Sequence, residues 1–257
     1  RLKYLMSLDD AAIVIDLMYG LPHQSMEVWQ DDVETLADCG IDGGDLYQLN
    51  VYEDSKLKMA VEKGTLPPFA KTSEQALMFK KGIEIMERKR FRRLSICHWA
   101  RNTRERNIYN SLSKSGAVTI PFGSGAGGRL EGYTFFVDRD VKSYIERIDK
   151  VEKPLMIMIA QHEDYGFYSS IVGQMDSGTV NLLKLKTDYG VDLKDIMEPV
   201  FNEWKRKGLI EINGDYLDLT IAGQFWYVNL TQAILDWLVM MKDENYTPVI
   251  KTIAGQG

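Results

Sequence analysis

The chain has 257 residues, of which 45% are hydrophobic and 26% are charged, a composition typical of a globular protein with a sizeable core. Its formal net charge of -6 disfavours non-specific binding to nucleic acid, which requires a basic face. No apolar run reaches the roughly 18 residues of a transmembrane helix, so we expect no membrane span. The only two cysteines, Cys39 and Cys97, argue against a disulfide scaffold and favour a cytoplasmic location.

The first half of the chain predicts alternating strands and helices. We expect strands at residues 11–22, 44–52 and 91–101, and helices at residues 25–40 and 72–89. The first strand reads as buried on both faces, and the first helix is capped by Ser25. Such alternation predicts a parallel sheet with right-handed crossovers, with too few units for a complete eight-stranded barrel. A fourth strand is expected within residues 116–128, where the chain enters a glycine-rich loop.

After about residue 153 the pattern changes to helix, turn, helix, hairpin, helix. The hairpin spans residues 207–220, with its turn centred on Asn213 and Gly214. A helix-turn-helix followed by such a hairpin predicts a mostly helical, winged-helix-like cap domain over residues 153–257. DNA binding is nevertheless disfavoured, because the helix before the hairpin ends in only three basic residues.

Four glycines fall within six residues of the segment "TIPFGSGAGGRLEGYTFF". They are Gly123, Gly125, Gly127 and Gly128, and they contain the dinucleotide-binding pattern G-x-G-x-x-G. A strand is expected after them where that motif requires a helix, so no helix N-terminus would face a pyrophosphate. Two interpretations stay open: a glycine turn between strands, or a loop whose backbone approaches a bulky ligand.

Polar side chains occur near the ends of the first two predicted strands. A carboxylate such as Asp16 among Ile and Val is costly unless it is paired or lies at the ligand-facing end of its strand. Ligands of α/β sheets bind at the carboxyl ends of strands, and Tyr19, Gln24, Gln48 and Asn50 lie at comparable ends. A hydrogen-bonded, structural role for Asp16 is the alternative.

The segment "HWARNTRERN" places His98, Arg101, Arg104 and Arg106 at and after the third predicted strand. Arginine pairs with carboxylates through two hydrogen bonds, so this segment suits an acidic ligand. An exposed arginine loop and a structural histidine are the alternative interpretation. We predict no metal site in this chain, because neither C-x-x-C nor H-E-x-x-H occurs, and no catalytic residue is identified.

Several segments together resemble the radical SAM family of oxygen-independent coproporphyrinogen III oxidases. They are "IDLMYGLPHQSMEVWQDDV", "DLYQLNVYEDSKLKMAVEKGTLP", "HWAR" and the glycine-rich loop. The resemblance extends from Arg1 to about Leu238. Within this family, "HWARNTRERNIYN" and "FGSGAGGRLEGY" look most like the anaerobic heme-degrading members, the heme-utilisation methyltransferases.

The resemblance implies an α/β fold, in which residues 1–152 form the C-terminal half of a partial (β/α)6 barrel with a glycine-loop hairpin. It also implies S-adenosyl-L-methionine (SAM) and a [4Fe–4S] cluster as cofactors, and heme as substrate. The family's CxxxCxxC motif is absent, and two distant cysteines cannot supply three thiolate ligands. We therefore expect the cluster ligands and the first barrel strands to lie upstream of Arg1.

Site residues follow from the resemblance. It implies that SAM or the tetrapyrrole contacts Asp16, Tyr19, Gln48, Asn50, Gly123, Gly125, Gly127, Gly128 and Arg129. From their charge and placement, we expect Arg101, Arg104 or Arg106 to bind the heme propionates and His98 to face the iron.

The implied activity is anaerobic heme degradation with methyl transfer, porphyrin ring opening and iron release. It requires an electron donor such as a flavodoxin or an NADPH-linked reductant, and no nucleic acid. The alternatives are a heme-binding chaperone without catalysis, a coproporphyrinogen III oxidase and a DNA-binding regulator.

Overall fold

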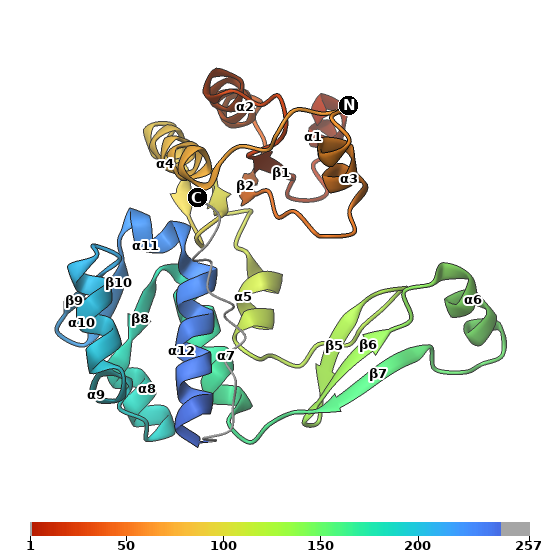
Figure 1. Ribbon diagram of the computed structural model, residues 1–257. Helices are drawn as coiled ribbons and strands as arrows, with labels where there is room; N and C mark the ends of the chain where they lie inside the picture. The colour runs from red at the N-terminus through yellow and green to blue at the C-terminus, as the bar shows by residue number, and fades with distance from the viewer. Residues whose placement is uncertain (1, 243–257) are drawn as a thin grey trace.

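The computed structural model describes residues 2–242 of the chain. Figure 1 shows three parts: a sheet with two long helices in the N-terminal part, a three-stranded arm, and a helical unit in the C-terminal part. None of the helices within residues 2–242 is long and apolar enough to cross a membrane.

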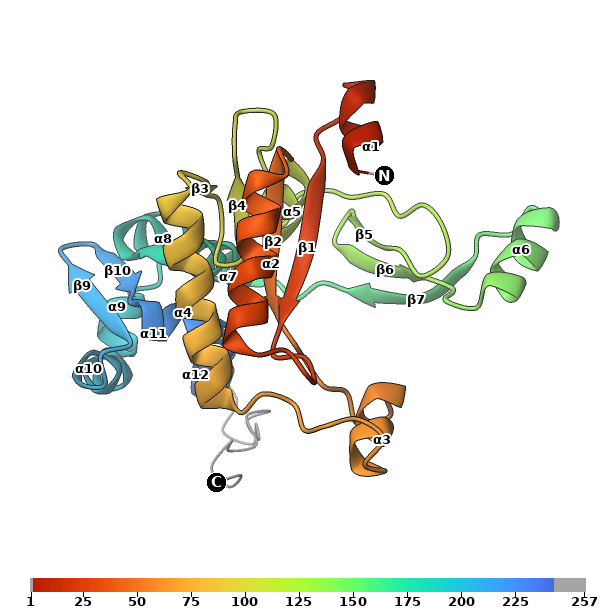
Figure 2. The same ribbon diagram turned by 90° about the horizontal axis from the view of Figure 1, so that it is seen from above.

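The N-terminal part alternates strands and helices, as predicted. Its elements are α1 (Leu2–Leu8), β1 (Val14–Tyr19), α2 (Met26–Asp38), β2 (Gly43–Gln48), α3 (Lys56–Glu62), α4 (Thr72–Arg88), β3 (Arg92–Arg93), β4 (His98–Ala100) and α5 (Ile108–Lys114). The sheet order is β1-β2-β4-β3, and β1 and β2 are parallel. Helices α2 and α4 pack on one face of this sheet, as Figure 2 shows.

A buried tryptophan joins these two helices. Trp29 of α2 has no exposed surface, and its Nε1 donates to the carbonyl oxygen of Met78 in α4 at 2.7 Å. The predicted cap is confirmed, because Ser25 Oγ accepts from the backbone nitrogen of Val28 at 3.3 Å. The face of the sheet that contacts α2 and α4 therefore packs into the core, and polar side chains lie on the opposite face.

Two predictions about this sheet are wrong. Strand β1 is not buried on both faces, because Asp16 and Met18 are exposed. The strand predicted at residues 91–101 is two short strands, and β4 is antiparallel to both β2 and β3. A tight turn causes the reversal, with Leu94 N donating to His98 O at 2.8 Å. The residues after β4 therefore lie at the amino ends of β1 and β2.

The arm is an antiparallel sheet with one helix. It contains β5 (Gly127–Leu130), β6 (Tyr133–Val137), α6 (Val141–Asp149) and β7 (Leu155–Ala160), in the sheet order β5-β6-β7. The hairpin between β5 and β6 turns at Glu131 and Gly132, whose φ angles are 48° and 78°. The fourth strand that we predicted ahead of this hairpin is only a single bridge, between Thr119 and Arg129.

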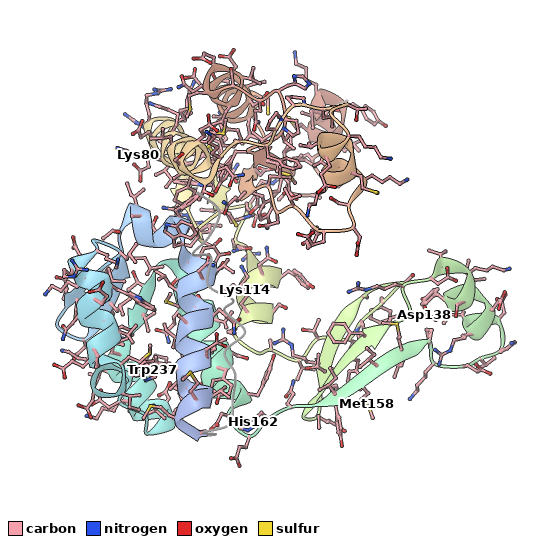
Figure 3. All side chains as sticks on the ribbon, viewed as in Figure 1. Lys80, Lys114, Asp138, Met158, His162 and Trp237 are labelled. Atoms are coloured by element: carbon pink, nitrogen blue, oxygen red, sulfur yellow. The ribbon has the colours of Figure 1, made fainter. Side chains whose placement is uncertain are left out.

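Strand β7 lies beyond residue 152, where we predicted the first domain to end, yet it pairs with β6 of the arm. Its residues are all apolar, and Met158 and Ile159 are 58% and 51% exposed. Figure 3 shows Met158 on the outer strand of the arm. Among the residues described, β7 has β6 as its only partner strand, so its outer edge is open.

The C-terminal part contains the predicted hairpin. Its elements are α7 (Tyr165–Ser177), β8 (Thr179–Asn181), α8 (Leu182–Tyr189), α9 (Leu193–Ile196), α10 (Glu198–Arg206), β9 (Ile210–Asn213), β10 (Tyr216–Leu219), α11 (Ile221–Phe225) and α12 (Tyr227–Lys242). The hairpin loop consists of Gly214 and Asp215, one residue later than predicted, because Asn213 pairs with Tyr216. The cap that we predicted extends to residue 257, and its last fifteen residues lie outside the described chain.

Contacts join this unit to the N-terminal part. The rings of Phe79 in α4 and Phe225 in α11 lie 5.8 Å apart, and Arg93 Nη1 donates to Gln224 Oε1 at 2.6 Å. The hydrophobic cores of the two parts are continuous through these residues.

Candidate functional site

The sheet face opposite α2 and α4 carries three polar side chains in register. Asp16 of β1 lies beside Asp45 of β2, and Asp45 lies beside His98 of β4. His98 Nδ1 is 2.7 Å from Asp45 Oδ2, and His98 Nε2 is 3.1 Å from Glu105 Oε1. Asp45 and His98 are each only 4% exposed. Four ionisable groups therefore run in a line from exposed Asp16, through two buried residues, to Glu105.

Their surroundings shift two of the pKa values upward. Burial raises the pKa of the Asp16 carboxyl, and the charge of Asp45 and hydrogen bonding to it raise it further. Burial by itself lowers the pKa of His98, but hydrogen bonds and charges from Asp45 and Glu105 outweigh burial, so its pKa is raised. The arrangement favours an imidazolium held between carboxylates.

A cavity of about 410 Å³ lies at the carboxyl ends of β1 and β2. It is lined by three predicted site residues, Tyr19, Gln48 and Asn50, together with Tyr47, Cys97 and the start of α12. Asp16 is not part of this lining, but Tyr47 follows Asp45 by two residues and so lies on the same face of β2. The structure thus brings three of the predicted residues together and places Asp16 on the adjoining polar face.

The side chains in this cavity are held by the core behind them. The Tyr19 ring packs 5.4 Å from Trp29, and Gln48 Nε2 donates to Gln75 Oε1 at 2.7 Å. Burial raises the pKa of the Cys97 thiol to about 12, so this cysteine stays protonated at neutral pH. Gln24, the fifth polar residue singled out, instead holds the turn after β1, since its Oε1 accepts from Gly20 N at 2.8 Å.

The arginine segment does not lie at the cavity, because the reversal of β4 carries it to the opposite edge of the sheet. Arg104 forms an ion pair with Asp9 and donates to Ala11 O at 3.0 Å. Arg101 Nη1 donates to the backbone carbonyl oxygen of Ala37 in α2 at 3.4 Å. Arg106 is exposed and makes no hydrogen bond or ion pair within the described residues. The exposed-loop interpretation therefore fits Arg101 and Arg104.

His98 is also placed differently from our expectation. Both of its ring nitrogens already have carboxylate partners, and the ring is buried. This geometry argues against His98 facing a heme iron, because either nitrogen would first have to lose its carboxylate.

The glycine-rich loop leads into β5 of the arm (Figure 1), and none of its residues lines the cavity. A Cβ atom on Gly128 would lie 2.4 Å from Pro121 Cδ and 2.5 Å from Thr119 O, so the chain's own backbone requires glycine there. Arg129 contacts the hydroxyl of Tyr165 and donates to Ser113 Oγ at 3.0 Å, which ties the arm to α7 and α5. These contacts support the turn interpretation.

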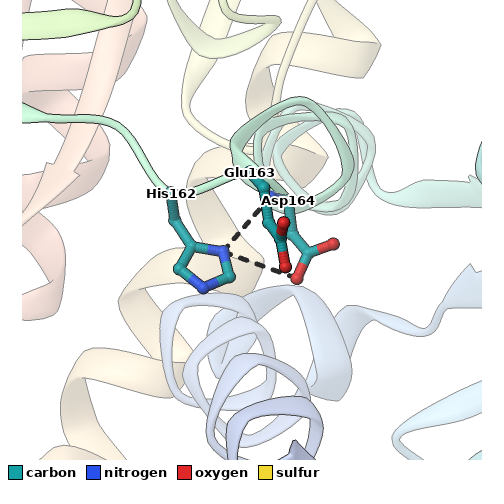
Figure 4. Close-up of side chains that lie close together, drawn as sticks. All are labelled: His162, Glu163 and Asp164. Carbon is teal, nitrogen blue, oxygen red and sulfur yellow. Dashed lines mark hydrogen bonds and ion pairs between the residues drawn. The ribbon is translucent and has the colours of Figure 1, made fainter.

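One group of possible metal ligands occurs within residues 2–242. His162, Glu163 and Asp164 offer ligand atoms within 4.8 Å of one another, and His162 Nδ1 is 3.4 Å from Asp164 Oδ2 (Figure 4). Lys242 also forms an ion pair with Asp164. The lysine already balances this carboxylate, and the group lies on the surface.

Comparisons with known proteins were made by sequence and by structure. No protein-family model matches the chain. The chain is 35% identical to the anaerobilin synthase of Escherichia coli O157:H7 over 235 residues, which cover 91% of this chain and 51% of that protein. It is 31% identical over 118 residues to radical S-adenosyl methionine domain-containing protein 1, mitochondrial, of Danio rerio, covering 46% of this chain and 26% of that one.

Among solved structures, coproporphyrinogen III oxidase from Escherichia coli, described as a radical SAM enzyme, superposes with a TM-score of 0.69. The match covers 91% of this chain and 57% of that one at 15% identity, so it shows an α/β fold of the radical SAM type. This chain belongs to the radical SAM family of coproporphyrinogen III oxidase-like proteins, in the anaerobilin synthase branch. It spans about half the length of the anaerobilin synthase.

Membership of the radical SAM family implies SAM and an iron–sulfur cluster. The cavity fits a ligand such as SAM, because it combines the amides of Gln48 and Asn50 with aromatic walls and adjoins the carboxylate face. The residues present do not fit the cluster. The chain has only two cysteines, Cys39 at the end of α2 and Cys97 in the turn before β4, and neither is part of a cysteine motif.

Sequence reasoning missed Asp45, Glu105 and Tyr47. Asp45 carries a recognisable signal, since it is a carboxylate in a buried strand beside the strand of Asp16. Glu105 gives no such signal, because its contact with His98 depends on the reversal of β4.

Proposed function

We propose that this chain is part of a radical SAM enzyme that degrades heme anaerobically, with methyl transfer, porphyrin ring opening and iron release. The observation that carries the proposal is the 35% identity with anaerobilin synthase, because it extends over 91% of this chain. The cavity at the strand ends supports it, since three residues expected at a SAM site line that cavity.

The proposal also includes a barrel for the N-terminal sheet and a cap for the C-terminal part. We place the four-stranded sheet in one side of a (β/α)6 barrel, a placement supported by the likeness to coproporphyrinogen III oxidase. Residues 165–242 would form a winged-helix-type cap, which is supported by the order α7, β8, α8, α9, α10, β9, β10 and by the three-stranded antiparallel sheet.

SAM, when bound and reduced, would supply the radical and the methyl group. In this proposal Asp16, Gln48 and Asn50 hold its polar groups, and Tyr19 provides an apolar wall. Arg106 is the arginine of its segment that remains available for a heme propionate.

The arm would contact the macrocycle. Phe122 beside the glycine-rich loop is 86% exposed and Met158 of β7 is 58% exposed, which gives a flat tetrapyrrole an apolar surface to meet.

The proposed partners are heme and an electron donor, either a flavodoxin-like protein or an NADPH-linked reductant, without nucleic acid. We also propose a cytoplasmic location. Its support is that both cysteines, Cys39 and Cys97, are unpaired, as is usual in a reducing compartment.

Spectroscopy of the full-length protein containing this chain tests the proposal. Heme, SAM and a reductant are mixed without oxygen, and the Soret band is followed. We expect the band to disappear only when SAM and reductant are both present, together with a new linear tetrapyrrole. A heme-binding chaperone would retain the Soret band, and turnover of coproporphyrinogen without heme loss would indicate an oxidase. Salt-sensitive duplex binding would indicate a DNA-binding regulator.

A further inference from the structure

The cavity at the carboxyl ends of β1 and β2 has two walls. One consists of the strand ends, and the other is formed by residues 224–229, where α11 is followed by α12 of the cap. None of the described residues that line the cavity has an acidic or basic side chain. Six of them are aromatic: Tyr19, Tyr47, Phe79, Phe225, Trp226 and Tyr227. Such a lining fits a flat, uncharged ring better than a heme propionate, which would need a cationic partner.

Four side-chain amides also line the cavity, two in each wall, and one in each wall already has a partner. Gln48 Nε2 donates to Gln75 Oε1 at 2.7 Å. In the opposite wall, Gln224 Oε1 accepts from Arg93 Nη1 at 2.6 Å, and Gln224 Nε2 donates to Leu219 O at 2.8 Å. These two glutamines are thus held by the protein itself.

The remaining two amides, of Asn50 and Asn229, form no side-chain hydrogen bond within residues 2–242. Asn229 lies in the first turn of α12, and Trp226 and Phe225, three and four residues earlier, line the same cavity, as expected for one helix face. A primary amide carries two donor hydrogens and an acceptor oxygen. A free amide in an aromatic cavity therefore suits a flat ring whose edge both donates and accepts.

We propose that Asn229 binds the adenine of SAM, so that the cap supplies part of the cofactor site. This rests on the proposed function, in which SAM occupies the cavity. Adenine carries an amino donor beside a ring-nitrogen acceptor, and the amide of asparagine matches both with two hydrogen bonds. The aromatic rings around the amide provide apolar contact for the faces of the purine.

Arg93 holds the cap wall in place. Its guanidinium lies 5.8 Å from the ring centroid of Phe79 and 5.1 Å from that of Trp99, both in the N-terminal part. It donates to Ile96 O at 2.5 Å and, across to α11, to Gln224 Oε1 at 2.6 Å. Lysine has a compact ammonium in place of the planar fork and does not reproduce these contacts. Arg93 is therefore a positioning residue, which acts on the cofactor through the start of α12.

Binding of SAM to the full-length protein with its cluster, measured by calorimetry without heme, tests the proposal in the absence of turnover. Asn229→Ala should raise the dissociation constant about 5- to 150-fold, as expected for loss of a two-bond amide contact with adenine. Alanine favours a helix, and the substitution removes no hydrogen bond within residues 2–242, so the melting temperature should not fall. Asn202→Ala, exposed on α10 and outside the cavity, is the matched control and should bind SAM as the wild type does.

Competition by two nucleosides tests the assignment to adenine. 5′-Deoxyinosine has a carbonyl oxygen where 5′-deoxyadenosine has the amino group. The wild type should prefer 5′-deoxyadenosine as a competitor of SAM, and Asn229→Ala should lose most of this preference. A preference that is unchanged in Asn229→Ala would overturn the assignment.

Arg93→Lys tests the positioning role. It should weaken SAM binding, and its combination with Asn229→Ala should weaken binding by less than the product of the two separate factors, because Arg93 acts through the wall that holds Asn229. Arg88→Lys, which changes an exposed arginine paired with Glu34, should leave SAM binding unchanged. A lower melting temperature of Arg93→Lys with unchanged affinity for SAM would show that Arg93 only stabilises the fold.

Equal affinity of the wild type and Asn229→Ala for SAM would overturn the proposal and leave the proposed function intact. Heme that persists although the wild type binds SAM and is supplied with reductant would refute the proposed function and leave this proposal standing. A wild type that binds no SAM would overturn both.

Discussion

The contact between His98 and Asp45 makes a quantitative prediction about stability. Replacing His98 by leucine removes the donor 2.7 Å from Asp45 Oδ2, and Asp45 Oδ1 already has no partner. Asp45 would then be a buried carboxylate without compensation, which costs about 3–5 kcal/mol of unfolding free energy. Asp45→Asn removes the charge itself, so its cost should be smaller, about 1–3 kcal/mol.

The double variant, which combines His98→Leu with Asp45→Asn, measures the interaction between the two residues apart from their other contacts. Once Asp45 is asparagine, removing His98 no longer leaves a buried charge without a partner. The losses of unfolding free energy in the two single variants should therefore not add, and we expect a coupling energy of about 1–3 kcal/mol. The assay is chemical denaturation of the four proteins of the cycle, followed by circular dichroism. The exposed pair Lys184–Asp188 provides a control cycle, with an expected coupling of about 0.3–0.5 kcal/mol. Costs at His98 and Asp45 that add within about 0.5 kcal/mol would refute this account of the contact.

The pKa of His98 is raised in the folded state, so its stabilising contribution is complete below the unfolded value of about 6.5 and is lost as pH rises through the folded value. The free energy of unfolding should therefore fall as pH rises above about 6.5, and this fall should be smaller in His98→Leu. Gly128→Ala should displace the segment containing Pro121, since the new methyl carbon would lie 2.4 Å from Cδ, and faster proteolysis of the arm would reveal this. Arg106→Ala should weaken heme binding with no change in the melting temperature. Arg104→Ala should instead lower the melting temperature slightly, because it removes the ion pair with Asp9. Equal effects of the two variants on heme binding would contradict the assignment of Arg106 to heme and of Arg104 to the fold.

Local patterns predicted much of the N-terminal part. Ser25 followed by an apolar helical repeat located α2, and the apolar runs located β1 and β2, because capping and burial depend on neighbouring residues. The turn before β4 was not predictable in this way. Four residues reverse the chain there, and their hydrogen bonds to His98 depend on tertiary context.

That single reversal explains most of what was missed at the site. It brings His98 beside Asp45 and places Arg101 and Arg104 at the amino ends of β1 and β2. Tyr19, Gln48 and Asn50 did come together at one cavity, because the carboxyl ends of adjacent parallel strands meet at one edge whatever follows them. The glycines were ambiguous, since a close approach to a ligand and a close approach to the chain's own backbone require the same residue.

The proposed function requires that this chain belong to an enzyme that transfers a methyl group from SAM to heme as the ring opens. The most direct test incubates the full-length protein without oxygen, with heme, reductant and SAM whose methyl group carries deuterium, and examines the tetrapyrrole product by mass spectrometry. The account predicts a linear, iron-free product that contains the deuterated methyl group. Intact heme, or an opened product without the label, would contradict it.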